Sequence, residues 1–202
     1  MIRFDGHRRV TKLDGTSEDA WFGYTCGHCG TRVAGAVVAV YTAKSGTRVN
    51  RWLACPECAL GSVEVQGVVF PAIKFGPAIE GLPDDVQFAY EEARRCLQVN
   101  AYTAAELVCR KILMHVAVDK GAPEGESFAA YLAALESLGY VTPPMKPWVD
   151  LIRRHGNQAT HRLAASDAAR AESTVMFTAE LLRMVYEMAH MARRYTPDNP
   201  TS

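Results

Sequence analysis

The chain has 202 residues, of which 49% are hydrophobic, and its 22 Lys and Arg balance its 22 Asp and Glu at a formal net charge of zero. This length suffices for one large core, or for a small metal-stabilised module joined to a helical domain, and we favour two units. Divided near residue 85, each part is close to neutral, which argues against a broad basic surface for nucleic acid. We therefore expect any contact with DNA or RNA to be local.

Two features argue against membrane attachment and secretion. Residues 1–5 lack the apolar core of a signal peptide. The longest apolar run, around residues 33–41, is far shorter than the ~20 residues that a membrane helix needs. We therefore expect a soluble, cytoplasmic protein.

The sharpest motif is a pair of Cys-x2-Cys knuckles, Cys26 with Cys29 and Cys55 with Cys58. Two such turns present four thiolates to one ion, which is the ligand set of a tetrahedral zinc site. We predict that these four cysteines hold a structural Zn2+, because four sulfur ligands leave no open position for substrate or water. His28, inside the first knuckle, is expected to be a loop residue rather than a ligand.

Short β-favouring runs fill the region from Trp21 to Val69, and residues 44–47 between two of them have the composition of a hairpin turn. We predict a small antiparallel sheet, so that residues 1–70 form a zinc ribbon. Residues 71–83 are rich in Pro and Gly and are predicted to be a linker.

After Pro83 the hydrophobic period changes from two to about 3.6, which indicates helices. The predicted bundle spans residues 84–196, and residues 197–202 are predicted to be a disordered tail. The fold class is therefore α+β, a β zinc ribbon followed by an all-α bundle. We expect five helices. The first carries an apolar stripe from about 84 to 97, the second runs from Thr103 to about Val118, and the third is opened by Ser127 and stopped by Gly139. The fourth carries Trp148 and Ile152 and meets Gly156-Asn157, and the fifth runs from about Ser166 to Tyr195.

Two details of the helical region give further predictions. Thr103 and Glu106 have the spacing of a capping box, so we expect Thr103 to open the second helix. Cys96 and Cys109 lie in helical segments and are expected to be buried as small apolar residues rather than joined in a disulfide.

One polar segment stands out in this mainly apolar domain, containing Arg154, His155, Asn157 and His161. In a continuous helix Arg154 and His161 share a face but lie about 10 Å apart along the axis. One phosphate can engage both only if Gly156-Asn157 bends the chain, or if a second copy supplies the missing partner.

Several motifs of the C-terminal part resemble the domain of unknown function DUF4145, which is grouped with the HEPN helical superfamily. The similarity covers roughly residues 84–192, and its most specific element is Arg-x-x-Gly-Asn-x-x-x-His. That family occurs in stand-alone bacterial proteins with an N-terminal zinc ribbon and in subunits of type I restriction systems. The similar segments are Asp84–Val86, Tyr90–Ala93, Ala101–Ala105 with Arg110, and Ile152–His161.

The resemblance implies a specific chemistry. Active HEPN members are metal-independent endoribonucleases with an Arg, a polar residue and a His a few residues later, and Arg154, His155 and His161 match this pattern. It also implies a homodimer in which two motifs face one cleft. There His161 would serve as general acid or base and Arg154 would stabilise the phosphorane, giving 2′,3′-cyclic phosphate and 5′-hydroxyl ends in phage defence or a stress response.

Two other interpretations stay open, and with them the question whether the protein is an enzyme. Asn157 can cap a helix, Arg154 can bond loop carbonyls and His161 can anchor a connection, which describes a non-catalytic dimeric interaction module, for example in a restriction or defence complex. The third interpretation, a DNA-binding zinc-ribbon regulator, is opposed by the neutral charge of residues 1–85 and by the lack of a recognisable recognition helix.

Overall fold

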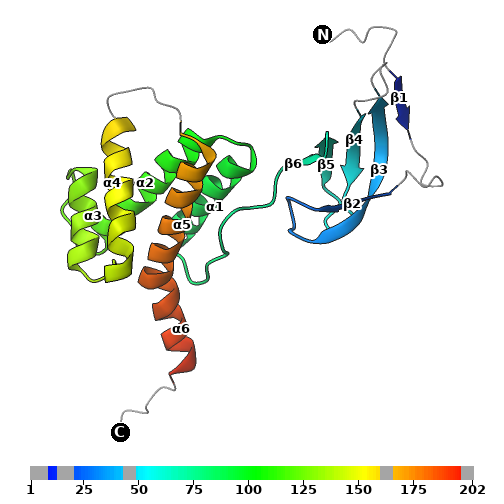
Figure 1. Ribbon diagram of the computed structural model, residues 1–202. Coiled ribbons are helices and arrows are strands. Elements are labelled where there is room, and N and C mark those ends of the chain that lie inside the picture. Colours follow the sequence, from blue (N-terminus) through cyan, green and yellow to red (C-terminus); the bar gives the residue numbers. More distant parts are fainter. Residues whose placement is uncertain (1–8, 13–20, 43–48, 160–165, 197–202) are drawn as a thin grey trace. The chain divides into compact units, whose positions relative to one another are not determined.

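The computed structural model describes residues 9–12, 21–42, 49–159 and 166–196, with side chains at 21–42, 50–154 and 166–196. The predicted hairpin turn at 44–47 and the predicted tail lie outside the described residues. The chain divides into two compact units, residues 1–74 and 75–202. The first is an antiparallel β unit and the second is helical, so the predicted α+β class is confirmed (Figure 1).

The β unit contains one antiparallel sheet of six described strands. Its hydrogen-bonded order is β1-β3-β4-β5-β6, and β2 also pairs with β3. The sheet is strongly curled (Figure 1). Its strands are β1 (Arg9–Lys12), β2 (Trp21–Thr25), β3 (Arg32–Thr42), β4 (Val49–Ala54), β5 (Gly61–Val65) and β6 (Val68–Phe70).

β3 organises this sheet because its length allows it to serve three neighbours. Its first half pairs with β2, its second half pairs with β1, and β4 lies along its other edge. The register with β4 shifts between Val37 and Ala39, which is a β-bulge that leaves the intervening Val38 exposed. A bulge increases the local twist of a strand, and here it lies where β3 passes from β2 to β1.

The core of the β unit is small. Among the described residues its buried apolar members are Tyr24, Val37 and Leu53, together with Cys26 and Cys55 of the two knuckles. Two of the five are therefore predicted metal ligands, so this core and the cysteine cluster are one structure.

The helical unit follows the predicted order of five helical segments. A single-turn 3-10 helix, Pro143–Met145, precedes the fourth of them. A π-helical turn, Arg183–Glu187, joins the last two helices into one continuous rod, as the single predicted segment implied. The helices are α1 (Asp84–Gln98), α2 (Tyr102–Asp119), α3 (Phe128–Ser137), α4 (Lys146–Ala159), α5 (Ala168–Leu182) and α6 (Met188–Tyr195).

α2 lies at the centre of the helical unit, in contact with α1, α3 and α5. Its buried apolar residues are Ala105, Cys109, Ile112, Leu113, Val116 and Ala117. Small side chains at 105 and 109 let neighbouring helices approach closely, because helix separation follows the side chains at the contact. Cys109 is thus a buried free thiol, and burial raises its pKa to about 12, whereas Cys96 is free and half-buried.

The sequence signals for helix ends are confirmed in part. Ser127 accepts a hydrogen bond from the Ala130 backbone N–H at 3.2 Å and so caps α3, and Gly139 follows that helix at φ +83°. Asn100 takes the corresponding left-handed position after α1 at φ +60°. The capping box is wrong, because α2 begins at Tyr102 and the Thr103 side chain makes no cap to it.

Residues 75–83 have no regular secondary structure, and they are fixed to α1 by hydrogen bonds. Arg94, buried in α1, donates to the carbonyls of Phe75 at 2.9 Å and Gly76 at 2.8 Å, and the Tyr90 hydroxyl donates to the Pro77 carbonyl at 3.0 Å. Among the helices of the described residues, none combines the length and the apolar character that a membrane crossing requires.

Candidate metal centre and the Arg154 segment

The two knuckles have the same backbone. The first connects β2 to β3, and its Cys26 accepts a hydrogen bond from the N–H of Gly30 at 2.8 Å. The second connects β4 to β5, and its Cys55 accepts from the N–H of Ala59 at 2.9 Å. The two donors occupy equivalent left-handed positions, φ +76° at Gly30 and φ +59° at Ala59. Because that region is unfavourable for a residue with a Cβ, the second turn is the strained one.

The first knuckle is also fixed by its surroundings. A Cβ added at Gly27 would lie 2.1 Å from the carbonyl oxygen of Pro71, so only glycine allows the returning chain to pass this close. The His28 Nε2 lies 3.0 Å from the carbonyl oxygen of Gly61, which joins the knuckle to β5. His28 is therefore a loop residue that contacts the backbone, as predicted.

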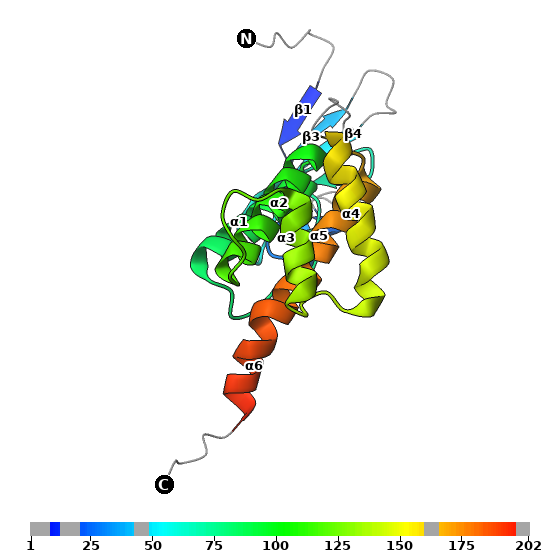
Figure 2. The same ribbon diagram turned by 90° about the vertical axis from the view of Figure 1, so that its left-hand side faces the viewer.

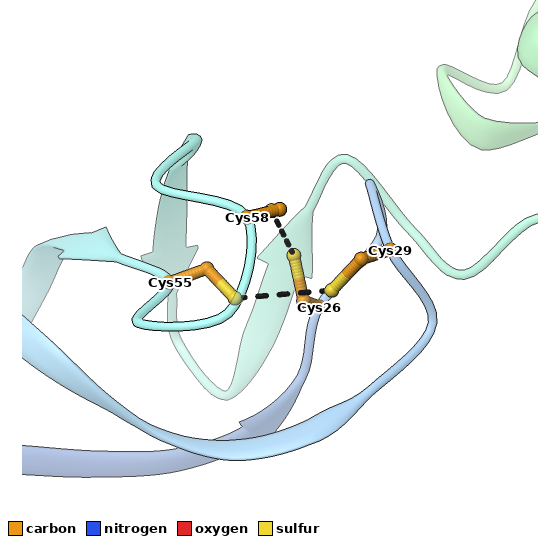
Figure 3. Close-up of side chains that lie close together, drawn as sticks. All are labelled: Cys26, Cys29, Cys55 and Cys58. Atoms are coloured by element: carbon orange, nitrogen blue, oxygen red, sulfur yellow. Dashed lines mark hydrogen bonds between the residues drawn. The ribbon is translucent and has the colours of Figure 1, made fainter.

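The four knuckle sulfurs converge (Figure 3). They all lie within 4.8 Å of one another, with 3.8 Å between Cys26 and Cys58 and 3.8 Å between Cys29 and Cys55. These distances are far longer than a disulfide bond of about 2.05 Å. Four sulfurs at about 2.3 Å from a central zinc form a tetrahedron whose edges are about 3.8 Å. The cluster thus has the dimensions of a tetrathiolate metal site and could hold a metal ion.

The charges of the cluster also favour a cation. Hydrogen bonds from the side chain and backbone of Thr31 lower the pKa of Cys29 to about 6, which favours its thiolate form. At Cys58 the backbone of Leu60 acts in the same direction, but burial and the neighbouring sulfurs raise the pKa to about 12. Four thiolates repel one another unless a positive ion lies between them, and a bound metal deprotonates its thiols outright.

An ion pair joins β4 and β5, the two strands that flank the second knuckle. Arg51 and Glu64, opposite one another on β4 and β5, are 2.7 Å apart, and the guanidinium lies 5.1 Å from the centre of the Phe22 ring. Glu64 is only 2% exposed and also accepts the Gly67 backbone N–H. The pair thus holds the β5-β6 turn against the strands that carry the knuckles.

The second predicted site lies on α4. Arg154 is exposed there and borders a shallow hollow with Pro147, Asp150 and Arg153. Arg153 donates to Asp150 at 2.9 Å, and its buried Nε has no partner among the described residues. Figure 2 shows α4 as one continuous helix at the edge of the unit.

The other members of that segment are placed less fully. α4 continues through Gly156 and Asn157 to Ala159, so the helix does not end at this pair. His155 and Asn157 lie on α4, but their side chains are outside the described residues, and so is the whole of His161. The structure therefore brings the four cysteines together and leaves the Arg154–His161 relation a prediction.

The helical unit also contains a buried polar cluster that the sequence patterns did not predict. Glu106 of α2, assigned above to a capping box, accepts hydrogen bonds from Arg170 at 2.7 Å, from Thr174 at 3.3 Å and from the Ser166 hydroxyl. The Ser166 backbone N–H also donates to Thr103 at 3.3 Å. The signal was present, because Glu106 falls on the same helical face as the buried Cys109 and Leu113. Glu106 thus anchors the start of α5 to the centre of the unit.

Comparison with known proteins locates the helical unit in one family. The model of the family described as "Domain of unknown function (DUF4145)" matches residues 91–197, more than half of the chain. No curated protein and no solved structure matches the chain. The matched range begins within α1 and extends past α6, so it covers nearly the whole bundle and none of the cysteine knuckles. The chain therefore belongs to the DUF4145 family.

Proposed function

We propose that this is a zinc-ribbon protein whose HEPN-like helical unit acts on RNA as a homodimer in the cytoplasm. The observation that carries the metal assignment is the 3.8 Å spacing of the paired sulfurs, which equals the edge expected for tetrahedral zinc. An all-sulfur donor set favours zinc over magnesium or calcium. Free thiols are maintained in reducing compartments, which supports the proposed location.

Zinc in this site is structural. Four protein sulfurs complete its coordination, so no position remains for a substrate or an activated water molecule. Cys26 and Cys55 are buried with the core of the β unit, so the ion links that core to both knuckles. The proposed chemistry on RNA therefore belongs to the helical unit and needs no metal.

The observation that supports an RNA role is the exposed guanidinium of Arg154, at the beginning of the polar segment of α4. In the proposed reaction the ribose 2′-oxygen attacks phosphorus as the bond to the 5′-oxygen breaks. The 2′-hydroxyl proton passes to a base and the 5′-oxygen accepts a proton, which leaves 2′,3′-cyclic phosphate and 5′-hydroxyl ends. His161 supplies this proton transfer, while Arg154 stabilises the charge on the phosphorane.

The length of α4 favours a site that two copies share. The helix continues for five residues beyond Arg154, which corresponds to about 7.5 Å of axial rise. Arg154 therefore reaches one phosphate together with a histidine more easily if that histidine belongs to a second copy. Two copies also provide two imidazoles, one to accept and one to donate a proton, with His155 and Asn157 bordering the cleft.

The test is RNA cleavage by the zinc-loaded protein without added divalent metal. We expect Arg154→Ala and His161→Ala each to reduce the cleavage rate at least 100-fold, as is usual for loss of a general acid or base or of charge stabilisation. Lys111→Ala, which removes an exposed cation of α2, is the matched control and is expected to leave the rate unchanged. Equal cleavage rates in wild type and His161→Ala would exclude this mechanism.

The second candidate function is a non-catalytic interaction module, docked in a restriction or defence complex. It is favoured by the zero net charge of the chain and by large apolar side chains exposed on the helices, such as Phe88 and Leu107. In this case the Arg154→Ala and His161→Ala variants still bind a stable protein partner, and the protein cleaves no RNA tested. Phage defence or a stress response is the proposed setting of either function.

A further inference from the structure

One continuous rod is formed by α5, the π-helical turn and α6, and its last part extends out of the helical unit. In α5 the rod is packed into the core, where Phe177 and Leu181 are fully buried. α6 has no buried residue. Figures 1 and 2 both show it extending beyond the other helices of this unit.

The exposed part of the rod carries an apolar stripe made of Met184, Met188, Met191 and Tyr195. Their exposed fractions are 39%, 57%, 43% and 69%. The spacing of four, three and four residues is the a/d spacing of a coiled coil. At about 100° per residue, positions 188, 191 and 195 fall within about 60° of one another. Four large apolar side chains on one face are a contact surface rather than scattered exposure.

One border of this stripe carries opposite charges at its two ends. Glu187 lies at one end, held by Arg183 at 2.8 Å and by the Glu80 backbone N–H at 3.0 Å. Arg194 lies seven residues further along, with its guanidinium 3.8 Å from the exposed carboxylate of Glu80. Glu187 and Arg194 occupy equivalent heptad positions next to the apolar seam.

We propose that α6 pairs with α6 of a second copy of this chain in antiparallel orientation. In that register Met188 packs against the partner's Met191, and Met184 packs against the partner's Tyr195, each contact occurring twice. Arg194 then lies beside the partner's Glu187 and Glu80, and the reverse contact follows from the twofold symmetry. A parallel pair would place these two positions on opposite flanks of the seam, so the contact between Arg194 and the partner's Glu187 would be lost.

This seam is short. Four side chains from each copy bury less than the about 1,200–2,000 Å2 that is typical of stable protein interfaces. The pairing is therefore reversible and depends on concentration unless other surfaces add to it. The inference rests on α6 alone: this contact is separate from the shared α4 cleft of the proposed function, and neither the zinc assignment nor the RNA chemistry is needed for it.

Sedimentation velocity of the full zinc-loaded chain over a concentration series tests the proposal. We expect wild type to dimerise and Met188→Glu or Met191→Glu to weaken dimerisation at least tenfold, because each places charges at the symmetric seam. Leu107→Glu, an equally exposed apolar position on α2, is the matched control and is expected to dimerise like wild type. A monomeric wild type, or an unchanged dimer in Met188→Glu, overturns the proposal.

Disulfide formation tests the orientation with variants whose folding is checked by far-ultraviolet circular dichroism. Met188→Cys chains mixed with Met191→Cys chains are expected to form the mixed disulfide faster than either variant forms its own. The reason is that position 188 faces the partner's position 191 in the antiparallel register. Preference for like with like would indicate parallel pairing, and either that result or the lack of any cross-link contradicts the proposal.

Discussion

The β unit and the helical unit of this chain are stabilised in different ways. Among the described residues, the helical unit buries a cluster of 25 apolar side chains, whereas the β unit buries five, two of which are cysteines of the knuckles. A core as small as that of the β unit rarely supports a fold without a metal or a disulfide. The comparison teaches that one chain combines a unit held by its apolar core with a unit that we expect to depend on its ion.

Removal of the metal has the largest expected effect and acts on one unit only. Structural zinc contributes about 10–16 kcal/mol of apparent binding free energy in small zinc domains, so a strong chelator should unfold the β unit. The fluorescence of Trp21 and Trp52 should change while the helical signal at 222 nm is retained. Loss of both signals together would show that the two units are not independent. Readdition of zinc should restore the fluorescence.

A cavity in the larger core should destabilise the helical unit. Phe177 of α5 is fully buried and packs edge-on against Trp148, with 5.6 Å between the ring centres. Phe177→Ala should lower the unfolding free energy of the helical unit by about 3–5 kcal/mol, measured by urea titration at 222 nm. Leu107→Ala, at an exposed site of α2, should change it by less than about 0.5 kcal/mol. Zinc content should be the same in both variants.

Removing the charge of the buried Glu106 carboxylate should destabilise the helical unit by a smaller amount. Glu106→Gln keeps the volume of the side chain but removes the negative charge that lies 2.7 Å from the guanidinium of Arg170. Since a hydrogen bond to a charged group contributes about 1.5–3 kcal/mol, we expect a loss of about 2 kcal/mol in the urea titration. Glu172→Gln, on the outer face of α5, is the control and should be nearly neutral. An unchanged stability in Glu106→Gln would mean that the cluster carries no net stabilisation.

The smallest effect is a gain of stability in the β unit. Ala59 occupies the left-handed position that Gly30 holds in the other knuckle, at φ +59°. Replacing it by glycine relieves a cost of about 1–2 kcal/mol, partly offset by the entropy that glycine loses on folding. Ala59→Gly should therefore raise the chelator concentration that unfolds the β unit. Ala54→Gly in β4 should lower it, and the opposite order would contradict the strain at Ala59.

Much of this fold could be predicted from the sequence because its signals are local. Paired Cys-x2-Cys spacing predicts that four sulfurs meet, and the 3.6-residue period predicts each helical segment. Ser127 and Gly139 act at the ends of α3 through their own backbone geometry, so the chain near them is sufficient to place them.

The rest depends on partners that are distant in the sequence. Glu106 has the spacing of a capping box, but its real partner, Arg170, is 64 residues away. Similarly, the apolar stripe of the last helix continues without change from Leu181 to Tyr195, and nothing in it marks where the bundle ends and α6 leaves it. At Gly156, the neighbouring helix turns support the backbone more strongly than one glycine weakens it, so α4 continues.

The central claim is tested most directly by identifying the bound metal and its ligands. Metal analysis of the purified chain, together with X-ray absorption at the zinc edge, should show one zinc per chain with four sulfur neighbours at about 2.3 Å. Cys55→Ser should lose the ion and the folded β unit while the helices remain. A chain that folds fully without metal, or a zinc with nitrogen or oxygen neighbours in place of these sulfurs, would contradict the account.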